Sequence, residues 1–169
     1  SIAQVHKATV RDPETGEIIP VAVKVLRDGV SHRFERDLAT FYIGARLMER
    51  VAPKIRRLRP VAVVDTLAES VRLEMDLRME AAALAEMADN IKDDEGFRVP
   101  SVDWDRSGSL VMTIEWIDGR KLSDVEGIRA DGHDLEKLGA LVIQSFLRHA
   151  MRDGFFHADM HPGNLFLDK

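Results

Sequence analysis

The stretch GFFHADMHPGNLFLDK, residues 154–169, decides the fold and the chemistry that the rest of the chain is expected to support. Asp159 and Asn164 stand in the spacing D-x-x-x-x-N, on a polar loop with an apolar run after it. In phosphoryl transfer, an aspartate at the first place orients the attacking hydroxyl group, and an asparagine oxygen at the second helps to hold Mg²⁺. The loop therefore predicts Asp159 as a catalytic residue and Asn164 as a metal ligand.

The apolar segment VAVKV, residues 21–25, contains one lysine, Lys24. An ammonium group buried in a strand is strongly unfavourable unless it is paired. Two readings are open: Lys24 reaches water from an exposed edge, or it contacts nucleotide phosphates and pairs with a glutamate of a helix. Asp159 and Asn164 favour the second reading. The helix-forming stretch 74–80 offers acidic partners, and its positions 76 and 80 share a face.

Alternating apolar residues, many of them β-branched, predict two pairs of strands. Segments 1–10 and 18–26 flank a turn with Pro, Gly and Asp, and segments 99–104 and 109–117 flank a Gly-containing turn. Both pairs are expected to be antiparallel hairpins, and a short strand is expected near residue 166.

Apolar residues at spacings of three and four predict helices. The first is expected to have Ser31 as its N-cap. Residues 60–92 contain no internal Gly or Pro, so one long helix is expected, with a bend or break possible. Residues 121–127 predict a short helix. Residues 133–154 predict a longer helix that is apolar on most faces, and hence buried, with Gly154 as its C-cap.

Composition restricts the class of protein. The chain has 169 residues, 45% hydrophobic and 31% charged, as in one globular domain. It has no cysteine, which excludes disulfides and thiolate metal sites. No apolar run approaches the ~18 residues of a spanning helix. The net charge of -5 argues against a nucleic-acid partner, whereas the basic run at 54–59 could contact acidic headgroups of a membrane.

Five motifs occur in a fixed order: SIAQVH, VAVKV, E-x-D-L-R-x-E-A-A, TIEWIDG and GFFHADMHPGNLF. Together they resemble the UbiB/AarF family of atypical protein-kinase-like proteins, over essentially the whole chain. The resemblance implies an α+β, protein-kinase-like fold. Residues 1–117 would form most of an N-lobe with inserted helices, and residues 118–169 would begin the C-lobe, including the catalytic loop, before the chain is cut short.

The resemblance also assigns roles to charged residues. Lys24 would be the strand lysine that meets the phosphates, Glu80 its partner from the helix, and Asp159 the catalytic aspartate. Glu74 and Asp76 match the family's acidic E-x-D pair. This pair would lie near the nucleotide and restrain ordinary protein-kinase activity.

The remaining assigned residues would surround the nucleotide. Ala3 would end the alanine-rich loop that replaces the glycine-rich lid, where its methyl group limits how closely the backbone approaches phosphate. Ala22 and Ile114 would line the pocket. Glu115 to Ile117 match the hinge, whose backbone would bind adenine.

The implied cofactors are ATP or ADP and Mg²⁺, and the implied activity is that of an atypical kinase or ATPase of ubiquinone biosynthesis. The family's second metal-binding aspartate and its K-x-G-Q motif would lie outside this chain, so a piece of a longer protein, inactive alone, is expected. Implied partners are adenine nucleotide and proteins or lipids of the quinone pathway. The implied place is the cytoplasmic side of a bacterial inner membrane, with peripheral attachment or anchors that this chain lacks.

Two other functions stay open. His157, Asp159 and His161 alternate, so on an extended segment they could bind iron as a quinone-pathway hydroxylase does. Against this, Pro162 and Gly163 favour a loop. A pseudokinase that binds nucleotide without transferring phosphate would need the same residues as the kinase.

Overall fold

The computed structural model describes residues 2–52, 54–156 and 161–168. Its main sheet has four antiparallel strands in the order β1-β2-β4-β3. β1 (Ala3–Arg11) and β2 (Ile18–Leu26) form the first predicted hairpin, and β3 (Val102–Asp103) and β4 (Val111–Glu115) form the second. The alternating apolar pattern therefore located both hairpins correctly. A 3-10 turn, Trp104–Arg106, lies in the second connection.

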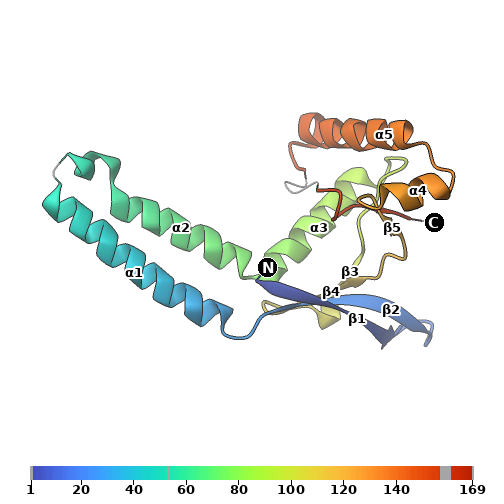
Figure 1. The fold of residues 1–169 in the computed structure, drawn as a ribbon. Helices are drawn as coiled ribbons and strands as arrows, with labels where there is room; N and C mark the ends of the chain where they lie inside the picture. Colours follow the sequence, from blue (N-terminus) through green and yellow to red (C-terminus); the bar gives the residue numbers. More distant parts are fainter. Residues whose placement is uncertain (1, 53, 157–160, 169) are drawn as a thin grey trace.

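Two long helices form an arm that extends away from the sheet (Figure 1). α1 (Val30–Val51) leads outward, a 3-10 turn (Ile55–Leu58) reverses the chain, and α2 (Pro60–Glu74) leads back. The expected N-cap at Ser31 is wrong, because Gly29 caps α1 with a φ of 70°. The chain leaves β2 through this left-handed conformation, which favours glycine.

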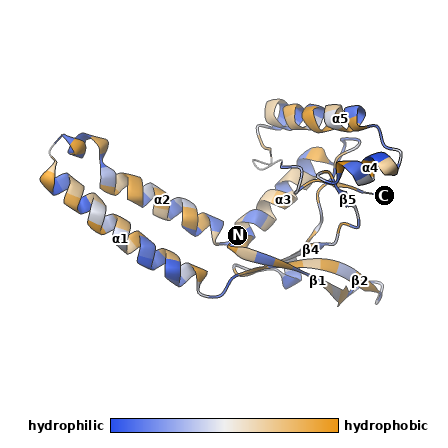
Figure 2. Cartoon of the chain, in the orientation of Figure 1, coloured by the Kyte–Doolittle hydropathy of each residue, from blue (hydrophilic) through white to orange (hydrophobic). Residues whose placement is uncertain are grey.

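The arm is held together by one apolar stripe from each helix. Leu38 and Ala45 of α1 pack with Val64 and Ala68 of α2. Hydrophobic and hydrophilic residues alternate along the two helices (Figure 2), as the periodicity of an amphipathic helix requires. The stripe therefore joins α1 to α2 and leaves the outer faces of the arm exposed.

The long helix expected over residues 60–92 is broken in two. α2 ends at Glu74, and α3 (Leu77–Ile91) begins after Asp76, whose side chain accepts a hydrogen bond from the Arg78 amide at 3.1 Å. The Leu77 amide donates to the Ser109 carbonyl at 3.0 Å, in the loop before β4. This contact with a distant segment, together with the Asp76 cap, starts a second helix where no Gly or Pro marks a boundary.

α3 packs against the sheet and forms the central core. Leu77 and Ala81 of α3 lie with Ala3, Leu26 and Met112, one residue from each of the three longer strands. All five are buried. The core therefore fixes the N-terminal half of α3 against one face of the sheet.

Residues 120–156 and 161–168 form a smaller unit beside α3 (Figure 1). β5 (Arg120–Lys121) pairs with β6 (Phe166–Leu167), and α4 (Val125–Ala130) begins after its Asp124 cap, four residues later than the helix expected at 121. α5 (Leu135–Arg148) continues as a π-helix, His149–Asp153, which Gly154 closes with a φ of 64°.

The expectation of a buried α5 is wrong. Ser145 is its one buried residue, while Ile143 and Leu147 are exposed. An apolar helix is buried only where neighbours cover it, and α5 meets chiefly α4 and its own π-helical extension. Among the described residues, no helix is both long and apolar enough to cross a membrane.

Candidate nucleotide-binding site

The predicted pair of Lys24 and Glu80 is present. Lys24 Nζ donates to both carboxylate oxygens of Glu80, each at 2.7 Å. Their side chains are 28% and 44% exposed, so the pair lies at the edge of the core and a ligand can reach it. Glu80 stands in the first turn of α3, where the helix dipole favours a negative charge. Leu77 and Ala81, on either side of it, fix this turn against the sheet.

The strand register shows which residues share the face of Lys24. Lys24 lies opposite Val5 on β1 and Met112 on β4, and Ala22 lies opposite Lys7 and Ile114. Residues opposite each other on neighbouring antiparallel strands point to the same side of the sheet. The predicted pocket residues Ala22 and Ile114 are therefore adjacent, two positions along β2 from the lysine.

Val5 completes this apolar surface and was missed in the sequence. Its side chain is 60% exposed on the strand directly beside Lys24. The signal was available, because the hairpin register between residues 3 and 26 determines which residues of β1 face the lysine. Ala3 lies further along, opposite Leu26, and its side chain is buried in the core with Leu77 and Ala81.

The predicted hinge, Glu115 to Ile117, leaves the end of β4. Trp116 has the Lys7 ammonium group 4.4 Å from its ring centre, a cation–π contact between the hinge and β1. Glu115 accepts hydrogen bonds from Arg98 at 2.9 and 3.0 Å. At Gly119, just after the hinge, the chain passes very close to β6. A Cβ at this position would lie 2.6 Å from the Leu167 carbonyl oxygen, so glycine is required there.

Arg98 is a second residue that sequence analysis missed. Besides Glu115, its guanidinium group binds Asp168, with Nε 2.8 Å from Oδ2, and these two carboxylates keep the pKa of Arg98 above its usual value. The bond to Asp168 is the larger cause. Arg98 therefore links the main sheet to the segment after β6. Its partners lie 17 and 70 positions away, so no local pattern could have revealed it.

Asp76 makes a structural contact at the start of α3. Asp76 caps α3, and its Oδ2 lies 2.6 Å from an Arg78 guanidinium nitrogen. These bonds from Arg78 keep the pKa of the Asp76 carboxyl below its usual value. Glu74 is the exposed last residue of α2. The predicted role of both acids near the nucleotide stays a prediction.

The polar loop is described only in part. Asp159 and His157 lie outside the described residues, so the catalytic aspartate and the iron alternative stay predictions. Asn164 is exposed in the turn before β6, and its backbone N–H donates a hydrogen bond to the His161 carbonyl at 2.8 Å. Among the described residues, no three His, Asp, Glu or Cys side chains gather as a metal site.

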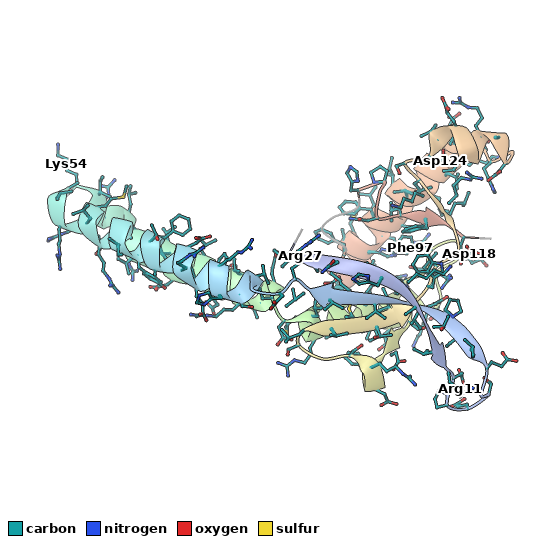
Figure 3. All side chains as sticks on the ribbon, turned by 60° about the horizontal axis from the view of Figure 1, so that its bottom comes forward. Arg11, Arg27, Lys54, Phe97, Asp118 and Asp124 are labelled. Carbon is teal, nitrogen blue, oxygen red and sulfur yellow. The ribbon has the colours of Figure 1, made fainter. Side chains whose placement is uncertain are left out.

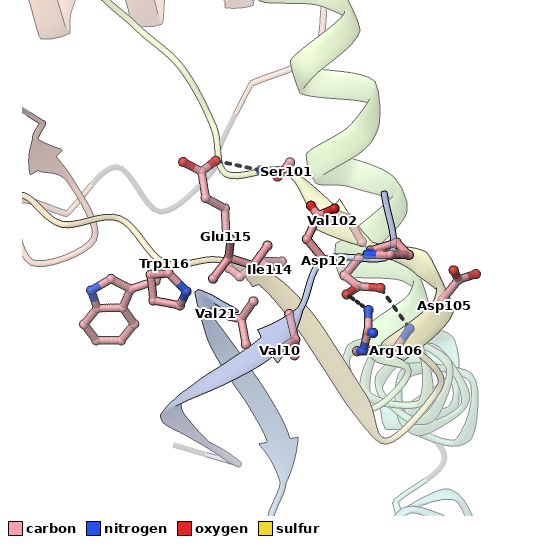
Figure 4. A pocket seen from close by; sticks show the side chains of 14 residues that line it. Val10, Asp12, Val21, Ser101, Val102, Asp105, Arg106, Ile114, Glu115 and Trp116 are labelled. Atoms are coloured by element: carbon pink, nitrogen blue, oxygen red, sulfur yellow. Dashed lines mark hydrogen bonds and ion pairs between the residues drawn. The ribbon is translucent and has the colours of Figure 1, made fainter. Parts of the chain in front are cut away.

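A pocket of about 470 Å³ is lined by residues from both faces of the sheet (Figure 4). Val21 lines the pocket, and alternation along β2 places its side chain on the other face of the sheet from those of Ala22 and Lys24. Two of its acidic groups are engaged: Asp103 binds Arg106, and Glu115 accepts a hydrogen bond from the Ser101 amide. Ile114, Glu115 and Trp116 also line this pocket, so it adjoins the predicted hinge, although Lys24 is not among its lining residues.

A lysine on a central strand, paired with a glutamate from the helix that covers the sheet, defines the N-lobe of a protein-kinase-like protein. The fold and site of residues 3–115 thus belong to this class. The chain belongs to the ABC1 atypical kinase-like domain family, whose model matches residues 1–169. This confirms the resemblance stated from the five motifs.

Relatives agree with this membership. The chain is 36% identical over 168 residues to a protein of Marinobacter nauticus, and 38% identical over 167 residues to one of Vibrio parahaemolyticus. Both bear the name "Probable protein kinase UbiB". Each match covers 99% of this chain but 30% of the relative, so the chain spans less than a third of their length.

A solved structure has the same fold. It is the complex of Rv3197 with erythromycin, from Mycobacterium tuberculosis, with a TM-score of 0.75 and 31% sequence identity. The match covers 99% of this chain and 40% of that one.

Proposed function

We propose that this chain is the nucleotide-facing part of a UbiB-type atypical kinase or ATPase, which binds Mg²⁺ and ATP or ADP and acts in ubiquinone biosynthesis. The observation that carries the proposal is the ion pair of Lys24 and Glu80. Its two 2.7 Å bonds hold one ammonium group at the edge of the core, beside an apolar surface. Family membership and the names of the relatives support the pathway.

The described residues fit a nucleotide. Val5, Ala22 and Ile114 offer an apolar surface for a flat base on the face of Lys24. The hinge backbone at 115–117 supplies the polar groups for its edge. Lys24, held in place by Glu80, would neutralise phosphate charge, and Ala3 would limit how closely the backbone approaches the phosphates. Bound nucleotide would supply the phosphoryl group, and Asn164 offers an amide oxygen for Mg²⁺.

The reactive step belongs to the polar loop in this proposal. Asp159 would accept or orient the proton of the attacking hydroxyl group or water. Glu74 and Asp76 would restrict phosphate acceptors near the nucleotide. The proposed setting is the cytoplasmic surface of a bacterial inner membrane, with adenine nucleotide and quinone-pathway proteins or lipids as partners.

Thermal unfolding with and without Mg·ADP tests the site. A ligand at about 100 times its Kd stabilises the folded protein by roughly 2.7 kcal/mol. We expect a saturable rise in Tm that Lys24→Met abolishes. Lys54→Met, which removes an exposed lysine from the far end of the arm, should leave the rise intact. No rise in the unmodified chain, or an equal rise in Lys24→Met, would overturn the proposal.

A second measurement separates transfer from binding alone. Asp159→Asn should retain the nucleotide-dependent rise in Tm while ATP hydrolysis by the whole natural protein disappears. Nucleotide binding without any hydrolysis in the unmodified protein would identify a pseudokinase scaffold instead. Stabilisation by Fe(II) alone, lost in His157→Ala, would favour the hydroxylase.

A further inference from the structure

The end of the arm carries a concentrated positive charge. Residues 46–60 contain six lysine or arginine side chains and one glutamate, a net charge of +5 in a chain whose net charge is -5. The rest of the chain therefore carries -10. All six cationic residues are exposed, and Lys54 stands at the outermost turn of the arm (Figure 3).

The one acid of this region is turned away from the outer surface. Glu49 is half-buried, and its carboxylate lies 3.4 Å from the Val61 amide of α2. Its carbonyl accepts a hydrogen bond from Arg56 Nε at 2.6 Å. Glu49 thus connects the two arm helices, and the outer surface of the tip is cationic.

Large aliphatic side chains are exposed among these cations. Val51 and Leu58 are 71% and 69% exposed on either side of the turn that joins the helices, and Leu47 and Met48 are exposed on α1. Singly exposed apolar residues are ordinary, but four within twelve positions at one tip are a patch. Protein surfaces that enter the headgroup region of a membrane typically combine cationic groups with an apolar patch.

We propose that the tip of the arm, residues 46–52 and 54–60, docks on the surface of an anionic lipid bilayer. Phosphate headgroups would meet the lysine and arginine side chains, and Val51 and Leu58 would be removed from water in the interface. A nucleic acid would neutralise the same charges, but tip residues 46–60 include no aromatic side chain to stack on bases, and the aliphatic groups would remain in water.

The shape of the molecule suits this contact. α1 has 22 residues, so the tip stands roughly 33 Å from the start of the arm. The acidic remainder of the chain would be repelled by an anionic surface, which orients the tip toward it. This docking deepens the proposed membrane setting but does not involve the Lys24 site, so failure of either experiment leaves the other result intact.

Vesicle flotation tests the docking with the complete chain. We expect binding to phosphatidylcholine vesicles that contain phosphatidylglycerol, little binding to pure phosphatidylcholine, and a steady loss with added NaCl. The triple variant Arg50→Gln, Lys54→Gln, Arg57→Gln should weaken the partition coefficient about fivefold for each charge, or roughly 100-fold in all. Val51→Ser with Leu58→Ser should weaken the binding that persists at high salt.

The matched control removes three exposed arginines from the base of the same arm: Arg33→Gln, Arg36→Gln and Arg72→Gln. It changes the net charge equally and should bind vesicles as the unmodified chain does. Circular dichroism establishes that each variant is folded. Absence of binding to the anionic vesicles, equal weakening by the tip and base variants, or binding to duplex DNA in preference to vesicles would each overturn the proposal.

Discussion

Lys24 and Glu80 form an ion pair whose value to stability is small. Both side chains are partly exposed, and such pairs contribute about 0–1 kcal/mol to the free energy of unfolding. Ala22 and Leu26, the residues two positions to either side of Lys24 on the same face of β2, are buried and apolar. An apolar residue would therefore be tolerated at position 24 by the fold, which is why the proposed test can separate loss of nucleotide from loss of structure.

The stability of the site comes instead from the residues beside Glu80. Leu77 is 2% exposed and packs with Ala3, Leu26 and Met112. Leu77→Ala should lower the free energy of unfolding by about 2–5 kcal/mol, because it leaves a cavity between α3 and the sheet. Urea denaturation measures this. Leu73→Ala, at an exposed position on α2, is the control and should change stability by less than about 0.5 kcal/mol; equal losses would contradict the assigned core.

The break between α2 and α3 places Glu80 in the first turn of α3. Asp76 caps α3, so Asp76→Ala should lower the free energy of unfolding by about 1 kcal/mol. Glu74→Ala, two residues away on the end of α2, should have little effect. Urea denaturation at pH 7 compares them. If the two variants behave alike, the cap does not stabilise α3.

The whole molecule is joined through Arg98, which binds Glu115 of β4 and Asp168 after β6. Arg98→Met should loosen the small β5–β6 unit while the main sheet persists. Amide hydrogen exchange measures this at Leu122, whose amide donates to the Leu165 carbonyl at 2.9 Å. Exchange there should quicken. Arg106→Met removes a local ion pair with Asp103 and is the control. Unchanged exchange at Leu122 in Arg98→Met would show that the Arg98 contacts do not stabilise the β5–β6 unit.

A second junction joins the end of α3 to the π-helix. Asp94 is 7% exposed, and Arg152 lies 2.7 Å from its Oδ1. His149 Nε2 lies 3.4 Å from Asp94 Oδ2, yet neither nitrogen of the buried His149 ring makes a hydrogen bond within the described chain. The hydrogen bonds from Arg152 are the main reason that the pKa of Asp94 lies below its usual value of 3.8.

This junction predicts a pH dependence. A carboxyl group whose pKa is lowered in the folded state stabilises the fold above its unfolded pKa, and that stabilisation is lost as pH falls through the lower, folded value. Asp94→Asn should therefore lower the urea midpoint at pH 7. The urea midpoint of this variant should also fall less steeply than that of the unmodified chain as the pH decreases below about 4. The exposed neighbour Asp93→Asn should keep the decline of the unmodified chain. An unaltered decline in Asp94→Asn would exclude this cause.

Local patterns in the sequence determined the two hairpins and the first helix of the arm, and the family resemblance identified Glu80 as the partner of Lys24. Alternation and helical periodicity are properties of neighbouring residues, and the ordered motifs carried the family and the kinase-like fold.

Only the tertiary structure decided what depends on distant contacts. The break before α3 needs the Ser109 carbonyl, and the Arg98 link needs partners from two other segments. Ile114 lies beside Ala22 only because the two predicted hairpins pair through β2 and β4. The exposure of α5 follows from which elements cover it rather than from its composition. A hydrogen bond or a buried surface requires two segments to meet, and the order of residues in one segment does not specify the other.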